Sequence, residues 1–145
     1  MVHQDLKPAN LLVGDHGEVM VVDWGLARAA GGGHGGVQGT PCYMAPEQAR
    51  GAAVDPRTDV YGLGLLLWEL CAGHHPFPGV RVEEVLERLG RGEVPAPPLG
   101  PWIIPEDLVT TIREATAADP ARRPRDGAAF ADRLRAWLDG ETARE

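Results

Sequence analysis

The residues of this chain that could do chemistry lie close together near its beginning. Asp5, Lys7 and Asn10 fall within the first ten residues, and Asp23 follows after a short apolar stretch. A carboxylate can orient an attacking hydroxyl and accept its proton, and a nearby lysine can offset charge that develops on a transferred phosphoryl group. Oxygens of asparagine and aspartate suit Mg²⁺ beside phosphate oxygens. Taken singly, such residues are more often helix caps or turn residues, so the interpretation depends on the joint pattern.

The stretch between Asn10 and Asp23 must position these two side chains. Two short apolar runs, 11–13 and 19–22, flank the turn-forming residues 14–17. This pattern predicts a β-hairpin. The hairpin would carry Asn10 at one end and Asp23 at the other, so that both could supply metal ligands.

The rest of the chain has mainly helical patterns. Apolar spacing predicts helices over residues 59–72, 82–89, 106–118 and 127–138. The first of these is apolar nearly all round, which is typical of a central helix that is buried on every side. The glycine-dense stretch 31–36 predicts a loop without one fixed shape. The expected fold class is mostly α with one β-hairpin.

Composition narrows the classes of function. The chain has 145 residues, a formal net charge of −7 and a pI of about 5.2, with acidic and basic residues interspersed. This balance argues against a nucleic-acid or membrane-surface binder. Its two cysteines, Cys42 and Cys71, follow no signal peptide, which predicts reduced thiols and a cytoplasmic protein. Abundant Ala, Gly, Pro and Arg without any serine suggests a bacterial source.

Three sequence blocks, in a fixed order, resemble those of eukaryotic-type serine/threonine protein kinases. H-x-D-L-K-P-x-N at 3–10 resembles the catalytic loop, in its serine/threonine-specific form. Asp-Trp-Gly at 23–25 resembles the metal-binding turn, and Ala-Pro-Glu at 45–47 resembles the end of the activation segment. The resemblance implies a partial kinase domain over 1–139, which is the helical large lobe without the N-terminal lobe, and a polar tail over 140–145.

The resemblance also implies an activity. The parent reaction would transfer the γ-phosphate of ATP to serine or threonine hydroxyls of a protein substrate, with ATP and Mg²⁺ as cofactors. Asp5 would be the catalytic base, and Lys7 would stabilise charge on the nucleotide phosphate. Asn10 and Asp23 would be the Mg²⁺ ligands.

Five more positions match residues that support the site in the family. His3 belongs to the catalytic-loop block. Thr40 resembles the residue that bonds the catalytic aspartate and lysine and shapes the substrate groove. Asp59 resembles the aspartate that hydrogen-bonds the catalytic-loop backbone, and Arg123 resembles the arginine that forms a salt bridge with Glu47.

One departure from the family pattern concerns regulation. Gln4 stands where the family usually has an arginine that pairs with a phosphorylated activation loop, and residues 26–39 contain no Ser, Thr or Tyr. Glutamine carries no charge and cannot make the bidentate pair. The sequence therefore predicts no switching by phosphorylation of this segment.

A second departure is larger. No glycine-rich phosphate loop followed by a strand lysine is found in the chain, and the stretch 31–36 precedes neither a strand nor a lysine. We therefore expect the N-terminal lobe upstream in the parent protein, and no activity from this piece alone. The helix that packs on the family's central helix would also lie upstream, so we expect residues 63–70 to leave part of their apolar surface uncovered. Two alternatives remain: a kinase-derived module that binds partners without catalysis, and a small-molecule phosphotransferase sharing H-x-D-x-x-x-x-N. Lys7-Pro8 and the segment 40–47 favour the protein kinase.

Overall fold

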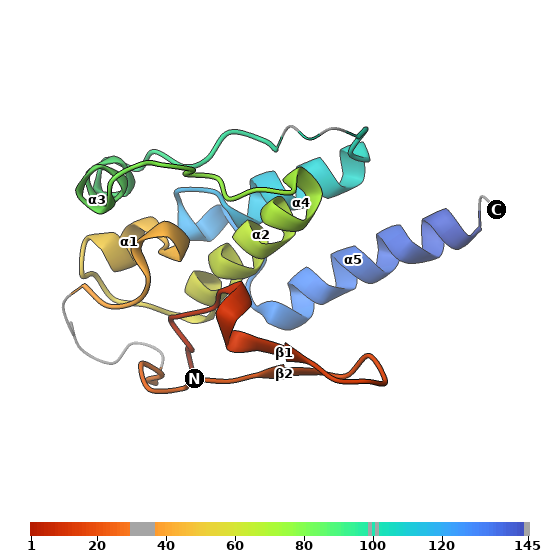
Figure 1. Cartoon of the computed structure of the whole chain (residues 1–145), viewed down its shortest axis with the longest axis horizontal. Coiled ribbons are helices and arrows are strands. Elements are labelled where there is room, and N and C mark those ends of the chain that lie inside the picture. Colours follow the sequence, from red (N-terminus) through yellow and green to blue (C-terminus); the bar gives the residue numbers. More distant parts are fainter. Residues whose placement is uncertain (30–36, 99, 101, 144–145) are drawn as a thin grey trace.

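The computed structural model describes residues 1–29, 37–98, 100 and 102–143, and the glycine-dense stretch 31–36 lies outside them. Figure 1 shows a central helix, α2, with the hairpin along one side and the last helix, α5, leading to the C-terminus. The elements in chain order are η1 (Pro8–Asn10), β1 (Leu11–Val13), β2 (Val19–Val21), η2 (Pro41–Tyr43), α1 (Pro46–Ala49), α2 (Pro56–Ala72), α3 (Val82–Gly90), α4 (Glu106–Ala115), η3 (Pro120–Arg122) and α5 (Gly127–Thr142). The predicted fold class, mostly helical with one hairpin, is confirmed.

The hairpin has the predicted strands. β1 and β2 pair antiparallel, with Leu11 opposite Val21 at one end and Val13 opposite Val19 at the other. The amide of Val22 donates to the carbonyl of Asn10 at 2.9 Å, which continues the pairing past the strands. The hairpin therefore brings Asn10 next to the residues that lead into Asp23.

Helix α2 begins three residues earlier than the sequence pattern predicts, at Pro56. The carboxylate of Asp55 accepts from the amide of Arg57 at 2.8 Å, which satisfies a donor of the first turn. Proline at the first helical position needs no hydrogen-bond acceptor. The helix ends at Gly73, whose φ of 77° is the left-handed conformation that favours glycine.

Three groups of buried side chains surround α2. One joins it to α1 and α3, a second joins it to α4 and α5, and a third lies at its N-terminal half. Their buried members are Met44, Ala45, Tyr61, Leu65, Val85 and Leu89; Trp68, Cys71, Ala72, Leu108 and Ile112; and Val60, Ala115 and Phe130. Gly64 lets α2 and α4 approach closely, because a Cβ there would lie 2.8 Å from the Cβ of Ala115.

One face of α2 is not covered, as expected for residues 63–70 without the helix that precedes them in the family, whereas the burial on every side that the apolar pattern alone predicts is wrong there. Leu70 is 77% exposed. It borders an apolar hollow of about 430 Å³, lined by Pro8, Leu11, Val13, Leu66, Glu69 and Leu70. The hairpin forms the opposite wall of this hollow and has no other element against it in Figure 1.

The two C-terminal helices differ from the predicted ranges. α4 ends at Ala115, where the hydroxyl of Thr116 donates to the carbonyl of Ile112 at 2.7 Å. α5 continues to Thr142, so the predicted polar tail begins within a helix. No helix among the described residues is long and apolar enough to cross a membrane.

The uneven burial of α2 yields a prediction about stability. Leu65→Ala should lower the free energy of unfolding by about 2–5 kcal/mol, because it leaves a cavity at a fully buried position. Leu70→Ala, on the same helix, should change it by only about 0.5 kcal/mol. Urea unfolding followed by circular dichroism measures both. Equal losses from the two variants would contradict this account of the core.

Candidate active site

The carboxylate of Asp5 and the ammonium of Lys7 share one partner, Thr40. The Thr40 hydroxyl donates to Oδ1 of Asp5 at 2.8 Å, and Nζ of Lys7 donates to the same hydroxyl at 2.7 Å. The Thr40 amide also donates to Oδ1 of Asp5, at 3.1 Å. Nζ of Lys7 lies 3.7 Å from the other carboxylate oxygen, Oδ2. A residue 35 positions away in the chain therefore fixes both groups.

Asn10 lies against the backbone of Asp5. Its side-chain Nδ2 donates to the Asp5 carbonyl at 2.8 Å, and its amide oxygen has no hydrogen-bond donor among the described residues. Asp23, at the other end of the hairpin, is exposed and has a φ of 60°. Its carboxylate likewise has no hydrogen bond or ion pair in the described part of the chain. Both side chains thus keep oxygen atoms available to a hard cation.

The described residues contain no group of three or more His, Cys, Asp or Glu side chains that could hold a metal by themselves. Mg²⁺ usually binds proteins through one or two side chains and completes its shell with phosphate oxygens and water. Asn10 and Asp23 fit that donor set.

His3 links the catalytic loop to the hairpin. Its Nδ1 accepts from the amide of Asp5 at 3.1 Å, so the proton lies on Nε2, which donates to the carbonyl of Val22 at 2.9 Å. The ring is buried and packs edge-on against Trp24, with centroids 4.7 Å apart. His3 therefore holds Asp5 and the approach to Asp23 in one unit.

Asp59, in the first turn of α2, holds the start of the catalytic loop. Its two carboxylate oxygens accept from the amides of His3 and Gln4, at 2.7 Å and 3.0 Å. Burial raises the pKa of the Asp59 carboxyl, although the two amide donors act in the opposite direction. The loop backbone is thus anchored on the central helix α2.

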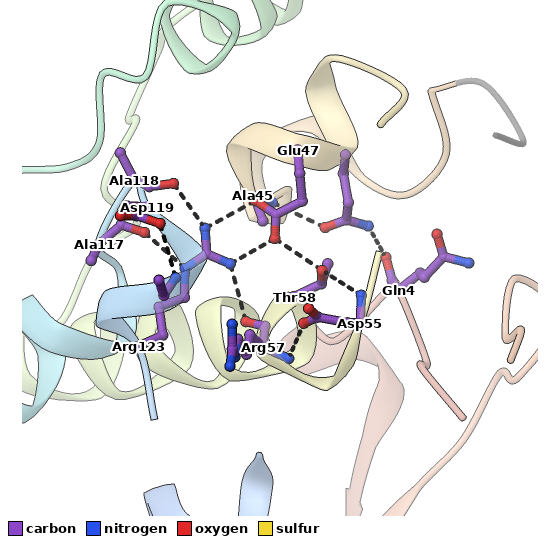
Figure 2. A network of polar contacts seen from close by, with 12 residues as sticks. Gln4, Ala45, Glu47, Asp55, Arg57, Thr58, Ala117, Ala118, Asp119 and Arg123 are labelled. Carbon is purple, nitrogen blue, oxygen red and sulfur yellow. Dashed lines mark hydrogen bonds and ion pairs between the residues drawn. The ribbon is translucent and has the colours of Figure 1, made fainter. Parts of the chain in front are cut away.

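Glu47 and Arg123 form a buried ion pair 76 positions apart in the chain (Figure 2). The guanidinium donates to both carboxylate oxygens, at 2.6 Å and 2.9 Å. Its remaining N–H groups donate to backbone carbonyls of Arg57, Ala117 and Ala118. The Arg123 side chain has no exposed surface, and all five guanidinium donors have acceptors.

The charge state of Glu47 follows from this arrangement. Burial by itself raises the pKa of the Glu47 carboxyl, but the hydrogen bonds and charge of Arg123 outweigh it, so the pKa lies below its ordinary value. Thr58 adds a hydrogen bond from its hydroxyl to Oε1 of Glu47 at 2.9 Å. The carboxylate is therefore the stable form inside the fold.

The family profile described as Protein kinase domain matches residues 1–124. The chain belongs to the protein kinase family.

Curated relatives of this kinase chain are serine/threonine-protein kinases. It is 36% identical over 140 residues to PknL of Mycobacterium tuberculosis, which covers 94% of the chain and 35% of PknL. It is 37% identical over 138 residues to PknK of Mycobacterium bovis (92% of the chain, 12% of PknK). It is also 37% identical over 153 residues to PknA of Mycobacterium tuberculosis (97% of the chain, 33% of PknA). The chain thus spans about a third or less of the length of these relatives.

The structure of this kinase chain brings together all nine residues that the sequence singled out, in two groups. His3, Asp5, Lys7, Asn10, Thr40 and Asp59 form one group with direct contacts between neighbours, and Asp23 stands exposed beside it. Glu47 and Arg123 form the second.

Sequence reasoning missed two contributors to these groups, Thr58 and Gln48, and one contact beside them, made by Tyr43. Thr58 bonds Glu47, and the buried side chain of Gln48 in α1 donates to the Gln4 carbonyl of the catalytic loop. Tyr43 donates its hydroxyl to Glu69 on α2 at 3.3 Å, and burial, with the Glu69 charge next, raises the pKa of Tyr43 to about 12. Only Thr58 had a sequence signal, since it lies three residues after the helix-capping Asp55.

The Glu47–Arg123 pair yields a prediction about stability and pH. Arg123→Met should lower the free energy of unfolding by about 3–5 kcal/mol at neutral pH, because Glu47 would be left buried and unpaired. The pKa of the Glu47 carboxyl is lower in the folded chain than its ordinary value of 4.5. The carboxylate therefore stabilises the fold at pH values above 4.5, and this stabilisation is lost as the pH falls through the pKa of the folded state. The difference in the free energy of unfolding between wild type and Arg123→Met should therefore become smaller as the pH falls below 4.5.

Urea unfolding of both proteins between neutral and acidic pH makes this measurement. Arg125→Met is the matched control, because Arg125 lies two residues away and its side chain is 82% exposed. It should change the free energy of unfolding by about 0.5 kcal/mol at most. A loss in Arg123→Met that is no larger than in the control would contradict the role given to the ion pair.

Proposed function

We propose that this chain carries the catalytic-loop half of a serine/threonine protein kinase, in which Asp5 accepts the proton of a substrate hydroxyl as that hydroxyl attacks a phosphoryl group. The observation that carries the proposal is the geometry of the Asp5 carboxylate. Thr40 fixes Oδ1 through two hydrogen bonds, at 2.8 Å and 3.1 Å, and the side chain remains partly open to solvent. A base held in one orientation and accessible from outside is what such a reaction needs.

Lys7 has the second role in the proposal. Its ammonium lies 3.7 Å from Oδ2 of Asp5 and is tied to Thr40, so its charge faces the place where a hydroxyl would bind. A cation there offsets negative charge that develops on the transferred group. Lys7 is the only lysine of the chain, in which all other basic residues are arginines.

Protein kinases as a family use ATP and Mg²⁺, which together supply the phosphoryl group and shield its charge. In the proposal Asn10 and Asp23 hold the cation through their free oxygens. Asn10 has a further task here, because its Nδ2 fixes the Asp5 carbonyl at 2.8 Å. A lysine that aligns the nucleotide from a strand must come from outside these 145 residues, since Lys7 is already engaged.

The proposed substrate is a protein rather than a small molecule. The segment from Thr40 to Glu47 leads from the Asp5 carboxylate to the buried ion pair and is held at both ends. Between these ends Tyr43 is bonded to Glu69 of α2. Such a fixed stretch beside the base suits an extended peptide, and the relatives are named as serine/threonine-protein kinases.

A fusion protein tests the proposal. The part of PknL that precedes its matched region would be joined ahead of Val2, and transfer of radiolabelled phosphate from Mg-ATP to a generic protein substrate would be measured. We expect transfer by the fusion, and a decrease of about a hundredfold or more in Asp5→Ala. The 145-residue chain alone should transfer none.

The matched control for Asp5→Ala is Asp15→Ala, since Asp15 is exposed in the hairpin turn and takes no part in the site. It should leave the rate unchanged. A fusion that binds Mg-ATP but transfers nothing would favour a binding module instead. Phosphorylation of a small aminoglycoside or choline in preference to protein would favour the small-molecule phosphotransferase.

The proposal includes a statement about regulation. Nε2 of Gln4 donates to the carbonyl of Leu26 at 2.6 Å, so a neutral side chain already ties the catalytic loop to the segment after Asp23. Residues 26–39 contain no hydroxyl that could be phosphorylated. The site therefore needs no phosphate to hold this segment.

Phosphatase treatment of the active fusion should accordingly leave its rate within about twofold of mock-treated protein. Mass spectrometry before and after treatment shows which phosphates were removed. A decrease of about tenfold, equal to about 1.4 kcal/mol in the barrier, together with a phosphate lost from residues 26–47, would refute the regulatory statement.

A further inference from the structure

Gln48 is a buried amide between the catalytic loop and the end of the activation segment. It lies in the short helix α1 and is 4% exposed. Its Nε2 donates to the carbonyl of Gln4 at 2.7 Å and, more weakly, to the carbonyl of Gln38 at 3.4 Å, and its Oε1 accepts from the amide of Ala45 at 3.0 Å. The side chain of Gln48 therefore bridges Gln4 and Ala45. One side chain thus joins two segments that are 44 positions apart.

The residue that Gln48 holds has an unusual backbone conformation. Gln4 has a φ of 73°, a left-handed conformation that costs a residue other than glycine about 1–3 kcal/mol and persists only when its surroundings enforce it. Asp59 holds the Gln4 amide and Gln48 holds the Gln4 carbonyl. Asp5 follows directly, so the conformation at Gln4 sets the direction in which the Asp5 side chain leaves the loop.

The hydrogen bond from Gln48 to the Gln4 carbonyl leaves no room for a side chain at position 39. A Cβ on Gly39 would lie 2.9 Å from the carbonyl oxygen of Gln4 and 3.2 Å from Nε2 of Gln48. Gly39 itself has a φ of 110° and directly precedes Thr40, the partner of Asp5. The loop, the bridge and the segment that carries Thr40 are therefore in contact at one point.

Loss of the Gln48 amide would leave a polar atom without a partner. The Gln4 carbonyl accepts no other hydrogen bond from the described residues. A buried acceptor without a donor is costly, so the loop would move to reach water or another donor. Any such movement would change the Gln4 conformation and with it the Asp5 carboxylate.

We propose that Gln48 is a positioning residue, whose amide holds the left-handed turn at Gln4 and so sets the Asp5 carboxylate against Thr40. This inference rests on the proposed function, because it assigns Gln48 a task in the same reaction. The plain alternative is that Gln48 only caps α1 through the Ala45 amide. The two hypotheses differ in which amides lose protection from exchange when the Gln48 side chain is replaced.

Gln48→Met separates them, because methionine fills a similar volume and makes none of the three hydrogen bonds. Amide hydrogen exchange of the 145-residue chain, resolved by residue, is the readout. We expect the amides of His3, Gln4 and Thr40 to exchange about tenfold faster or more. Capping alone would speed exchange only at the Ala45 amide and in α1, at residues 47–49, and that outcome would overturn the proposal.

The matched control is Thr111→Val, which also replaces a buried polar side chain by an apolar one. Thr111 is 7% exposed and its hydroxyl bonds the Asp107 carbonyl within α4, far from the loop in the chain. It should leave exchange at His3, Gln4 and Thr40 unchanged, and an equal increase there in both variants would also overturn the proposal. If Gln48→Met does not fold, Gln48→Asn takes its place, since its shorter amide cannot make all three bonds.

A kinetic measurement on the fusion protein completes the test. Gln48→Met should lower kcat by about tenfold or more and leave KM for ATP within about twofold, whereas Thr111→Val should change neither. An unchanged kcat in an active fusion would count against the proposal. If the fusion with Gln48 intact is inactive, the proposed function fails, and the exchange measurement still decides the role of Gln48.

Discussion

The ion pair between Glu47 and Arg123 is the interaction on which the other parts of the structure depend. It is the point where the end of the activation segment, the start of α2 and the turn before α5 meet, and Arg123 contacts all three. A buried charge pair of this kind adds little to stability beyond what well-packed apolar residues would give, but breaking it from one side is costly. The ion pair instead fixes the relative positions of several segments, because the guanidinium bonds all of them at once.

The geometry of the candidate active site depends on that junction. Asp5 and Lys7 come from a loop with a strained residue at its centre, and Thr40 comes from a segment without regular structure. Neither segment could hold a fixed shape alone. Buried polar contacts hold them against helix α2 and the end of the activation segment, and a satisfied network of this kind specifies one arrangement because every alternative leaves a buried polar group unpaired.

The sequence predicted the hairpin and the four longer helices, and the resemblance singled out the residues that the structure brings together in two groups. The reasons differ from one feature to the next. The hairpin followed from two apolar runs around a turn, because strand pairing across a short turn is a local property. The start of α2 was placed too late because its first turn is polar, and the cap at Asp55 decides the boundary. The pairing of Glu47 with Arg123 came from the resemblance, since no local pattern joins residues so far apart.

What the sequence could not predict depends on contacts across the fold. The bridge of Gln48 to Gln4 has no local signature, because a buried glutamine and an exposed one look alike in sequence. The open face of α2 at Leu70 was expected from the resemblance, because the helix that covers it in the family is missing from this chain, but the apolar pattern of the helix alone predicts burial on every side. Burial of one side of a helix is set by its neighbours, and periodicity does not identify them.

The central claim is that the buried ion pair holds the segment that presents Thr40 to the catalytic loop. Hydrogen exchange at the Thr40 amide, which donates to Asp5, tests it most directly in a double-mutant cycle of Glu47→Gln and Arg123→Met. The account predicts that each variant speeds Thr40 exchange by about tenfold or more relative to the most protected amides of α2. It predicts that the double variant is no faster than the single ones. Thr40 exchange that stays at the wild-type rate in both single variants would contradict the account.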